Sequence, residues 1–331
     1  MRDSLLLFAF LSLFYSSFSA AQTEVVTDSI PKYWTKGAGI GFDLGQLLHI
    51  NPTVGGGLNQ IGFGSSVGYF ANYKKNRVAW DNTIFWQFGI QKLGSGVLPS
   101  GKKIPFQKTI DNLQVTSKVG NKTKEGSKFY YAAELNFNSQ FLPTYPGNLL
   151  RDTSTVENTS LIAKLFAPAR IQLATGIDYK PNQKVSIFYA PLAYKSVLVL
   201  DDDIARLGFH GNPVRYENDV VVEFRNVDHQ FGSFAAVNYS DTYLNQKVVL
   251  TSKLNLFSNY LDHPERIDID LNANIAVNLF KNIQLSMMLR LFYDYDVLVQ
   301  KSDFNTSTEQ WEIGRGVSFA EQLLIKYNVT F

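Results

Sequence analysis

The amino-acid sequence predicts an all-β protein, a closed antiparallel up-and-down β-barrel that crosses a membrane with twelve strands. Three observations lead to this prediction. Apolar and polar residues alternate along many segments, and the connections between those segments are alternately short and long. An export signal is followed by no apolar stretch long enough for a spanning helix. A closed barrel then remains the way to cross a bilayer, because each backbone group pairs with a neighbouring strand.

The first element is a targeting segment at residues 1–21. Arg2 precedes the apolar run Leu5–Tyr15, and small residues follow up to Ala21, which is the arrangement of a cleaved secretory signal. A short membrane anchor is the alternative, but the apolar run is well below the roughly 20 residues that a spanning helix needs. We therefore expect export to the outer membrane of a Gram-negative bacterium, a short periplasmic tail at 22–33 and the barrel at 34–331.

Composition excludes several classes of function. The net charge of the 331 residues is +2 and no Lys/Arg run occurs, so a general electrostatic nucleic-acid binder is excluded. The chain has no cysteine, which excludes disulfides, thiolate zinc sites and cysteine nucleophiles. The four histidines lie far apart without the spacing of metal ligands. No metal, cofactor or nucleic acid is expected.

The clearest alternation lies in Ile267–Leu279, where the odd positions are apolar and the even positions are Asp or Asn, apart from Ala276. A strand places all the apolar residues of such a segment on one face, whereas a helix would scatter them. The same period occurs in Val78–Ile90, Phe129–Phe141, Ile171–Tyr179 and Leu285–Tyr295. A soluble sandwich alternates too, so the period alone does not tell which face meets water.

Strand number and loop length favour the barrel over a periplasmic sandwich. Five connections, such as Lys281-Asn282, are tight, and those between them are mostly longer and richer in Gly and polar residues. Such alternation is typical of outer-membrane barrels with short periplasmic turns and longer extracellular loops. An even number of strands is expected to leave both chain termini on the periplasmic side. The predicted strands lie near 35–50, 58–72, 77–92, 108–122, 127–142, 165–180, 183–199, 229–241, 244–260, 265–281, 282–297 and 315–331.

The last predicted strand carries a second targeting feature. Apolar residues alternate with Leu324, Lys326, Asn328 and Thr330 and end on an aromatic residue, which resembles the terminal-strand signal read by the barrel assembly machinery. An ordinary edge strand that ends in Phe is the alternative. Glu321 has the parity of the apolar set, so we expect a bulge there or a position above the apolar band. The signal residues are Leu323, Ile325, Tyr327, Val329 and Phe331.

Short motifs follow one another in a fixed order from about residue 40 to the end of the sequence. They are Trp80-Asp81-Asn82, Gln140-Phe141 with Pro143 and Tyr145, Phe166-Ala167-Pro168, Gly176–Pro181, Pro191-Leu192, Leu256–Tyr260 and Tyr293–Asp296. In this order they resemble a Bacteroidota domain-of-unknown-function family, family 3078, of predicted outer-membrane barrels. One departure is that Asn51 is followed by Pro52 where the family tends to carry Trp. The resemblance implies a location and a fold and supplies no mechanism.

The polar residues that alternate with the apolar, outward-facing residues of each strand are expected to line the lumen. Pairing the hairpin around Lys281-Asn282 with both apolar faces outward places Asp294 opposite Asp268 or Asp270, with Arg290 one inward position away. Two interpretations stay open: an acidic outer vestibule that favours cations, or ion pairs that stiffen a solvated lumen. The candidate lumen residues are Asp81, Glu134, Arg170, Asp178, Asp268, Asp270, Arg290 and Asp294.

Three weaker features carry alternatives. Gly37, Gly39 and Gly41 form a GxGxG inside a strand pattern, which favours close packing over a nucleotide site. Aromatic residues at strand ends are interpreted as an interfacial girdle rather than a ligand platform: Trp34, Tyr73, Tyr145, Tyr260 and Trp311. His49 and His263 fall near the predicted extracellular rim, where an outer-membrane hydrolase would need them, yet no G-x-S-x-G motif accompanies them.

The function expected from these features is a pore or channel for small solutes or ions, with the loop Leu200–Asp228 long enough to fold inward as a constriction. A closed structural or binding barrel that presents its loops to a partner or glycan is the alternative, and an outer-membrane hydrolase is the third. The expected partners are outer-membrane lipid and, during biogenesis, the barrel assembly machinery. The sequence identifies neither the solute nor a protein partner.

Overall fold

The computed structural model describes residues 33–43, 46–50, 60–91, 106–146, 148–150, 161–218, 220–305 and 310–330. The predicted signal peptide, most of the predicted tail and Phe331 lie outside these residues. Among the described residues, no helix has the length and apolar character that crossing a bilayer as a helix requires.

The structure is a closed barrel of twelve antiparallel strands, which confirms the predicted fold class. Its first strand consists of two segments, β1 and β2, which both pair with β3 on one side and with β17 on the other. The barrel strands are β1 (Trp34–Asp43), β2 (Gln46–Ile50), β3 (Gln60–Lys75), β4 (Val78–Gln91), β5 (Gln107–Lys122), β6 (Phe129–Ser139), β7 (Ala169–Tyr179), β8 (Val185–Leu198), β11 (Val227–Tyr243), β12 (Val248–Asn259), β13 (Ile267–Phe280), β14 (Ile283–Tyr293) and β17 (Ser318–Thr330).

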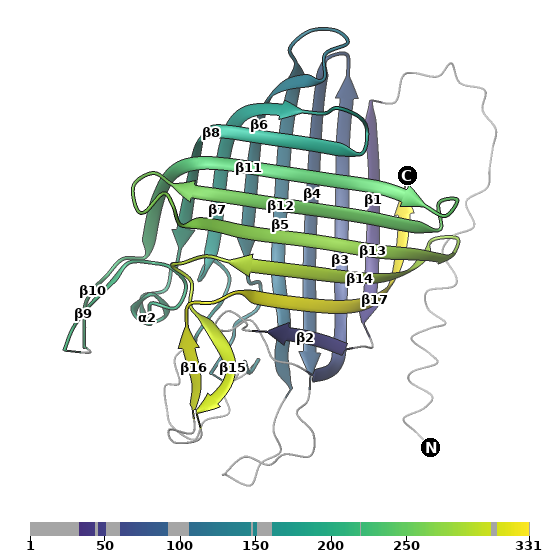
Figure 1. Cartoon of the computed structure of the whole chain (residues 1–331). Helices are drawn as coiled ribbons and strands as arrows, with labels where there is room; N and C mark the ends of the chain where they lie inside the picture. The colour runs from purple at the N-terminus through teal and green to yellow at the C-terminus, as the bar shows by residue number, and fades with distance from the viewer. Residues whose placement is uncertain are drawn as a thin grey trace, which may run out of the picture. The chain divides into compact units, whose positions relative to one another are not determined.

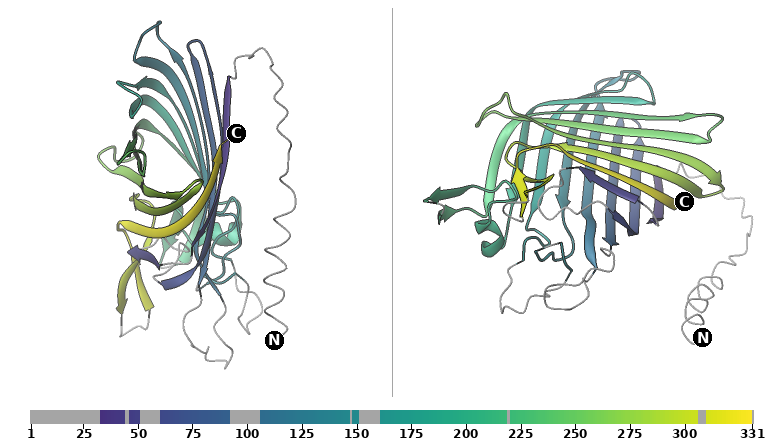
Figure 2. Two further views of the ribbon diagram at one scale, coloured as in Figure 1. Left: turned by 90° about the vertical axis from the view of Figure 1, so that its right-hand side faces the viewer. Right: turned by 60° about the horizontal axis from the view of Figure 1, so that its bottom comes forward.

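The barrel closes at a seam between its first and last strands. Ile40 pairs with Tyr327 and Phe42 with Ile325, while Leu47 in β2 pairs with Gln322. Figure 2 shows the purple β1 and the yellow β17 side by side at this seam. In Figure 1 the strands of the near wall cross those of the far wall steeply, as expected when every strand tilts strongly against the barrel axis.

The two ends of the barrel differ, and we call them the turn end and the loop end. At the turn end, Asn76 and Asn282 take positive φ angles of 52° and 69° in the tight turns β3–β4 and β13–β14. Asn tolerates this conformation better than other non-glycine residues, which is why these short connections are possible. The connections at the loop end are longer, apart from β12–β13, and carry α2 (Asp202–Arg206), β9 (Val214–Glu217), β10 (Val220–Phe224), β15 (Val299–Asn305) and β16 (Gln310–Gly314).

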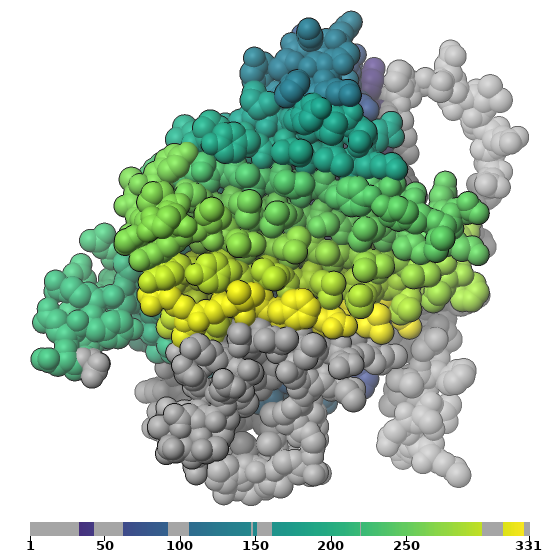
Figure 3. Space-filling model, in the orientation of Figure 1, coloured from purple at the N-terminus to yellow at the C-terminus, as the bar shows by residue number. Residues whose placement is uncertain are grey.

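The loop between β8 and β11 divides into two parts. In the first, Asp201 caps α2 by accepting a hydrogen bond from the Ile204 backbone N–H, and the buried Ile204 and Ala205 pack against Val197 and Val199. In the second, the hairpin β9–β10 stands away from the barrel wall (Figure 3). The first part therefore packs against the barrel's own residues, and the hairpin joins this cluster only at its end, through Phe224.

Side chains alternate between the outer face and the lumen as the period of two requires. In β7 the side chain of Leu173 is 49% exposed on the outer face, whereas Ala174 and Asp178 are buried inside. The lumen is partly filled by apolar residues as well. The ring centroids of Phe188 in β8 and Phe234 in β11 lie 6.1 Å apart, and both rings belong to a buried cluster with Ala132, Ala174 and other residues. The barrel therefore has a solid region along one wall rather than a uniform polar channel.

Strand β8 contains one extra residue at Pro191. Its register with β7 and with β11 shifts at this point, so Tyr189 and Leu192 are both exposed on the outer face. Proline lacks the N–H that the ladder needs and is tolerated at such a bulge. Gly176 lies opposite, where an added Cβ would overlap the carbonyl oxygen of Tyr189. Because of the bulge, the inward side chains change from even positions, such as Phe188, to odd positions, so that Lys195 faces the lumen.

Candidate functional site: the polar lumen

The predicted lumen residues lie on the inner face of the barrel or at its loop end. Glu134 and Asp178 are buried in β6 and β7, and Asp294 is buried just after β14. Asp81 is half-buried in β4, where its backbone pairs with that of Lys118. The other four residues take part in the contacts described next.

At the loop end, acidic and basic groups form ion pairs across the lumen. The Nζ of Lys195 in β8 lies 2.6 Å from Asp268 in β13 and 3.0 Å from Asp294. Arg290 in β14 donates two hydrogen bonds, of 3.0 and 3.2 Å, to Asp270 of the neighbouring strand. Three carboxylates that the sequence places close together are thus each paired with a cation. Of the two interpretations of this region, ion pairs are what the structure contains.

A second group of ion pairs lies deeper in the barrel. Glu134 is 3.0 Å from Lys253, which reaches it from β12 on another part of the wall, and 3.6 Å from Lys118. Lys118 also lies 3.0 Å from Asp178, which accepts a hydrogen bond of 2.6 Å from Ser186. Both carboxylates are nearly inaccessible to solvent, so pairing offsets the cost of burying their charge.

Arg170 in β7 differs from the cations of the two groups of ion pairs. It has no carboxylate within 4 Å among the described residues, and its Nε is buried without a hydrogen-bond partner. Its Nη2 donates a 3.2 Å hydrogen bond to the backbone carbonyl of His210, and its guanidinium lies 5.8 Å from the ring of Phe292. Arg290 approaches the same ring at 5.2 Å. Phe292 therefore contacts two guanidinium groups.

His210 belongs to the loop between β8 and β11 and is buried at the loop end of the lumen. Its Nε2 lies 2.7 Å from the carbonyl oxygen of Ile162 and donates a hydrogen bond to it. Burial lowers the pKa of His210 to about 4, and the charge of Arg170 acts in the same direction. The imidazole is therefore neutral near pH 7. This segment of the loop reaches the lumen, while the hairpin that follows it does not.

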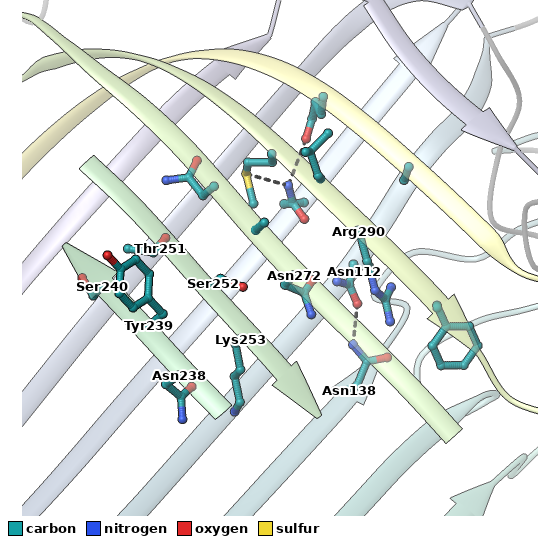
Figure 4. A pocket seen from close by; sticks show the side chains of 18 of the residues that line it. Asn112, Asn138, Asn238, Tyr239, Ser240, Thr251, Ser252, Lys253, Asn272 and Arg290 are labelled. Carbon is teal, nitrogen blue, oxygen red and sulfur yellow. Dashed lines mark hydrogen bonds between the residues drawn. The ribbon is translucent and has the colours of Figure 1, made fainter. Parts of the chain in front are cut away.

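The lumen contains a cavity of about 600 Å³ and a second of about 270 Å³ that share part of their lining. The larger one is lined mainly by amide and hydroxyl side chains. Figure 4 labels ten of its lining residues, among them Lys253 and Arg290. Its lining reaches both ends of the barrel, with Lys180 and Asn182 from the turn end and His210 and Val297 from the loop end. Gln87 in β4 hydrogen-bonds Gln322 in β17 at 2.9 Å, so side chains also link separate parts of the wall.

Sequence reasoning missed the basic partners Lys118, Lys195 and Lys253. All three occupy inward positions of alternating strands, and this parity was the signal that could have found them. Their carboxylate partners come from strands that are not their neighbours, except in the contact of Lys118 with Glu134.

The remaining candidates are separate from the lumen contacts. His263 lies on an exposed loop with its Nδ1 2.9 Å from Glu265, and the side chain of His49 lies outside the described part. Gly41 is buried where a Cβ would overlap Ser66 Oγ, which supports close packing for the GxGxG glycines. Trp34 packs on Tyr73 at 5.1 Å near the turn end. The described residues contain no cluster of three or more His, Cys, Asp or Glu placed to hold a metal ion.

The profile of one family, described as "Protein of unknown function (DUF3078)", matches residues 49–145. A search of curated proteins finds no match. Among solved structures, an outer membrane channel from Pseudomonas putida F1 matches at 11% identity and a TM-score of 0.40, covering 94% of this chain and 100% of that chain.

Two further structures are similar at a comparable level. The translocator domain of the autotransporter NalP from Neisseria meningitidis gives 8% identity, a TM-score of 0.34 and coverage of 89% of this chain and 86% of that chain. The Pseudomonas putida toluene transporter TodX gives 9% identity, a TM-score of 0.32 and coverage of 91% of both chains. Identities of this size do not transfer an activity to this chain.

Proposed function

We propose that this chain is an outer-membrane barrel whose lumen lets small polar solutes cross the membrane. The observation that carries the proposal is the polar cavity of about 600 Å³, whose lining extends from the turn end to the loop end. At about 30 Å³ for each molecule of liquid water, this space corresponds to some 20 waters, enough for a small hydrated solute.

The outer face supports the membrane part of the proposal. Apolar side chains such as Leu192, Ile325 and Phe63 are exposed over the barrel wall, and the closed sheet leaves no unpaired strand edge. Most of the barrel strands reach the 9–11 residues that cross a bilayer when tilted. Short turns then face the periplasm and long loops the exterior. Removal of a signal peptide at residues 1–21 belongs to the same proposal.

The last strand supports a role for the barrel assembly machinery. Leu323, Ile325 and Tyr327 are exposed on the outer face of β17, as a terminal signal on the lipid side would require. Glu321 shares their parity and pairs in register with Leu289 close to the loop end of the strand, which is compatible with a position near the edge of the apolar band. The side chain of Val329 lies outside the described part.

The absence of cysteine from the native chain allows a direct test of passage. The purified barrel is inserted into planar lipid bilayers, and Asn272→Cys, in the lining of the larger cavity, is labelled with a bulky thiol reagent. We expect the native barrel to conduct and the label to reduce the conductance several-fold.

The matched control is Ile275→Cys, which places the same label on the exposed outer face of the same strand. It should leave the conductance unchanged. A native barrel without conductance in bilayers and without solute uptake in liposomes refutes the proposal, and so does a label at position 272 that has no effect.

A binding barrel is the second candidate, because the hairpin β9–β10 exposes Tyr216, Val220 and Val222 away from the wall. Apolar side chains exposed on a projecting hairpin favour contact with a partner or a surface glycan. Deleting residues 214–224 separates the two candidates, since a pore keeps its conductance without the hairpin while a binding barrel loses its ligand.

A further inference from the structure

Apart from Arg170, each charged side chain that lines the larger cavity lies close to an opposite charge. Lys253 lies 3.0 Å from Glu134, Arg290 lies 3.0 Å from Asp270, and Asp111 lies 3.0 Å from Lys108. At the turn end, the two lining lysines follow the same rule. Lys180 is 3.5 Å from Asp178, which it shares with Lys118 at 3.0 Å, and Lys184 is 2.8 Å from Asp241. A charge and its counter-charge at such separations largely cancel at the distance of a passing solute.

The lining contains two further groups that can carry a positive charge, His210 and Arg170. His210 is held neutral by burial and by the positive charge of Arg170 nearby, which together outweigh its hydrogen bond to the Ile162 carbonyl. Arg170 lacks a direct ion pair among the described residues; the carboxylates of Asp294, Asp268 and Asp270 act on its charge, and the neighbouring Arg290 acts in the opposite sense. No described segment of this lining therefore presents a ring of like charges, which is the device that selects ions of one sign in pores.

Neutral hydrogen-bonding groups make up most of the rest of the lining. The amide of Asn138 in β6 donates to Asn112 in β5, and Asn272, Thr251 and Ser240 come from the adjacent strands β13, β12 and β11 (Figure 4). A carboxamide both donates and accepts, and a hydroxyl does the same, so these groups can replace the water shell of an uncharged polar solute from either side.

We infer that the lumen passes neutral hydrogen-bonding solutes, of the size of a small saccharide, with little discrimination between cations and anions. This inference rests on the proposed function and names its substrate class. It also differs from a cation-selective pore, which the acidic residues would give if they were unpaired.

The reversal potential in a tenfold KCl gradient tests the inference. A pore ideal for one ion would reverse at about 59 mV in magnitude. The native barrel is expected to reverse close to zero, and liposomes should take up glucose faster than gluconate or glucosamine, which have similar size and opposite charges. These two measurements use the native chain and do not depend on a variant that folds.

Two substitutions in one ion pair sharpen the test. Asp270→Asn leaves Arg290 without its partner and should shift the reversal potential toward anion preference. Arg290→Gln leaves Asp270 without its partner and should shift it toward cation preference. The control is Glu217→Gln, which removes a charge from the exposed Arg215–Glu217 pair of the β9–β10 hairpin and should produce no shift.

The outcomes separate the two proposals. No conductance and no uptake of any solute refute the proposed function, and the inference with it. Conductance with a native reversal potential near the ideal value for one ion, or uptake that favours one charged sugar over glucose, refutes the inference and leaves the pore. Opposite shifts in the two pair variants around a native value near zero support it.

Discussion

The ammonium group of Lys195 is the common partner of two carboxylates at the loop end of the lumen. Its side chain is 8% exposed, lies 5.2 Å from the ring of Phe257 and contacts both Asp268 and Asp294. Burial removes the water that would otherwise solvate these three charges, so each depends on the others. Asp296, two residues after Asp294 in the sequence, has its pKa raised by burial and by the charge of Asp294. The acidic residues here therefore need a central cation.

Lys195→Met should destabilise the barrel by about 3–5 kcal/mol, because it leaves buried carboxylates without their counter-charge. Urea unfolding in detergent, followed by tryptophan fluorescence, measures the loss. The triple variant that also carries Asp268→Asn and Asp294→Asn should recover part of it, since the carboxylates are then neutral.

The control for this substitution is Lys184→Met. Its pair with Asp241 has a comparable length of 2.8 Å, but the lysine is 56% exposed, so water and salt already screen the interaction. The unfolding midpoint should hardly change. Equal effects of the two substitutions would show that burial does not determine the strength of the Lys195 contacts.

At the scale of the element, the bulge at Pro191 in β8 depends on a glycine in the next strand. Gly176 in β7 leaves the space that the Tyr189 carbonyl oxygen occupies, and a Cβ there would also meet the backbone of Ala190. Backbone atoms inside a sheet ladder cannot move aside as a flexible side chain can. The glycine is thus required by a close approach of two strands and not by an unusual φ angle.

Gly176→Ala should therefore lower the unfolding free energy by about 1–3 kcal/mol, the usual cost of overpacking, or prevent barrel formation. Gly120→Ala is the matched control within a strand, because its nearest neighbour would be Tyr130 Cδ1 at an ordinary 3.5 Å. Heat-dependent gel mobility in detergent compares the two. A Gly176→Ala barrel as stable as the Gly120→Ala barrel would contradict the account of the bulge.

The barrel strands were predictable because a strand with one face in lipid and the other in water repeats every two residues. The predicted 265–281 and 282–297 correspond to β13 and β14, with the turn at Asn282. The bulge in β8 was not predicted, since one extra residue shifts the parity without a change in composition. The short elements α2, β9 and β10 were also missed, because too few residues carry a period there.

Only the contacts within the β13–β14 hairpin were predictable from the sequence. Pairing within the β13–β14 hairpin brings Asp268 and Asp294 together, and local register contains that information. Lys195 comes from β8, which β11 and β12 separate from β13, so its contact depends on the curvature of the closed wall. Register between chain neighbours does not contain this curvature. The sequence therefore indicated the acidic groups and Arg290, and left Lys195 unassigned.

For the whole molecule, the outer face determines which environment the barrel requires. Leu173→Lys places a charge in the middle of β7 on this face and should cost about 2–4 kcal/mol in a lipid bilayer. Folding equilibria in vesicles measure the cost. Leu200→Lys is the control, because Leu200 is equally accessible, at 56% exposed, but lies in the connection beyond β8. Equal stability of both variants would show that this face is not in contact with lipid.

The seam between β1 and β17 gives biogenesis an order. Consecutive barrel strands form hairpins or longer antiparallel pairs with their predecessors, whereas Ile40 meets Tyr327 only when the sheet curls round on itself. Until then the nascent sheet displays two rows of unsatisfied N–H and C=O groups, and a second nascent copy offers matching rows. The extent of strand pairing between copies therefore depends on how long the nascent sheet stays open, rather than on the stability of the closed barrel. A factor that covers either row should raise the yield of closed barrels.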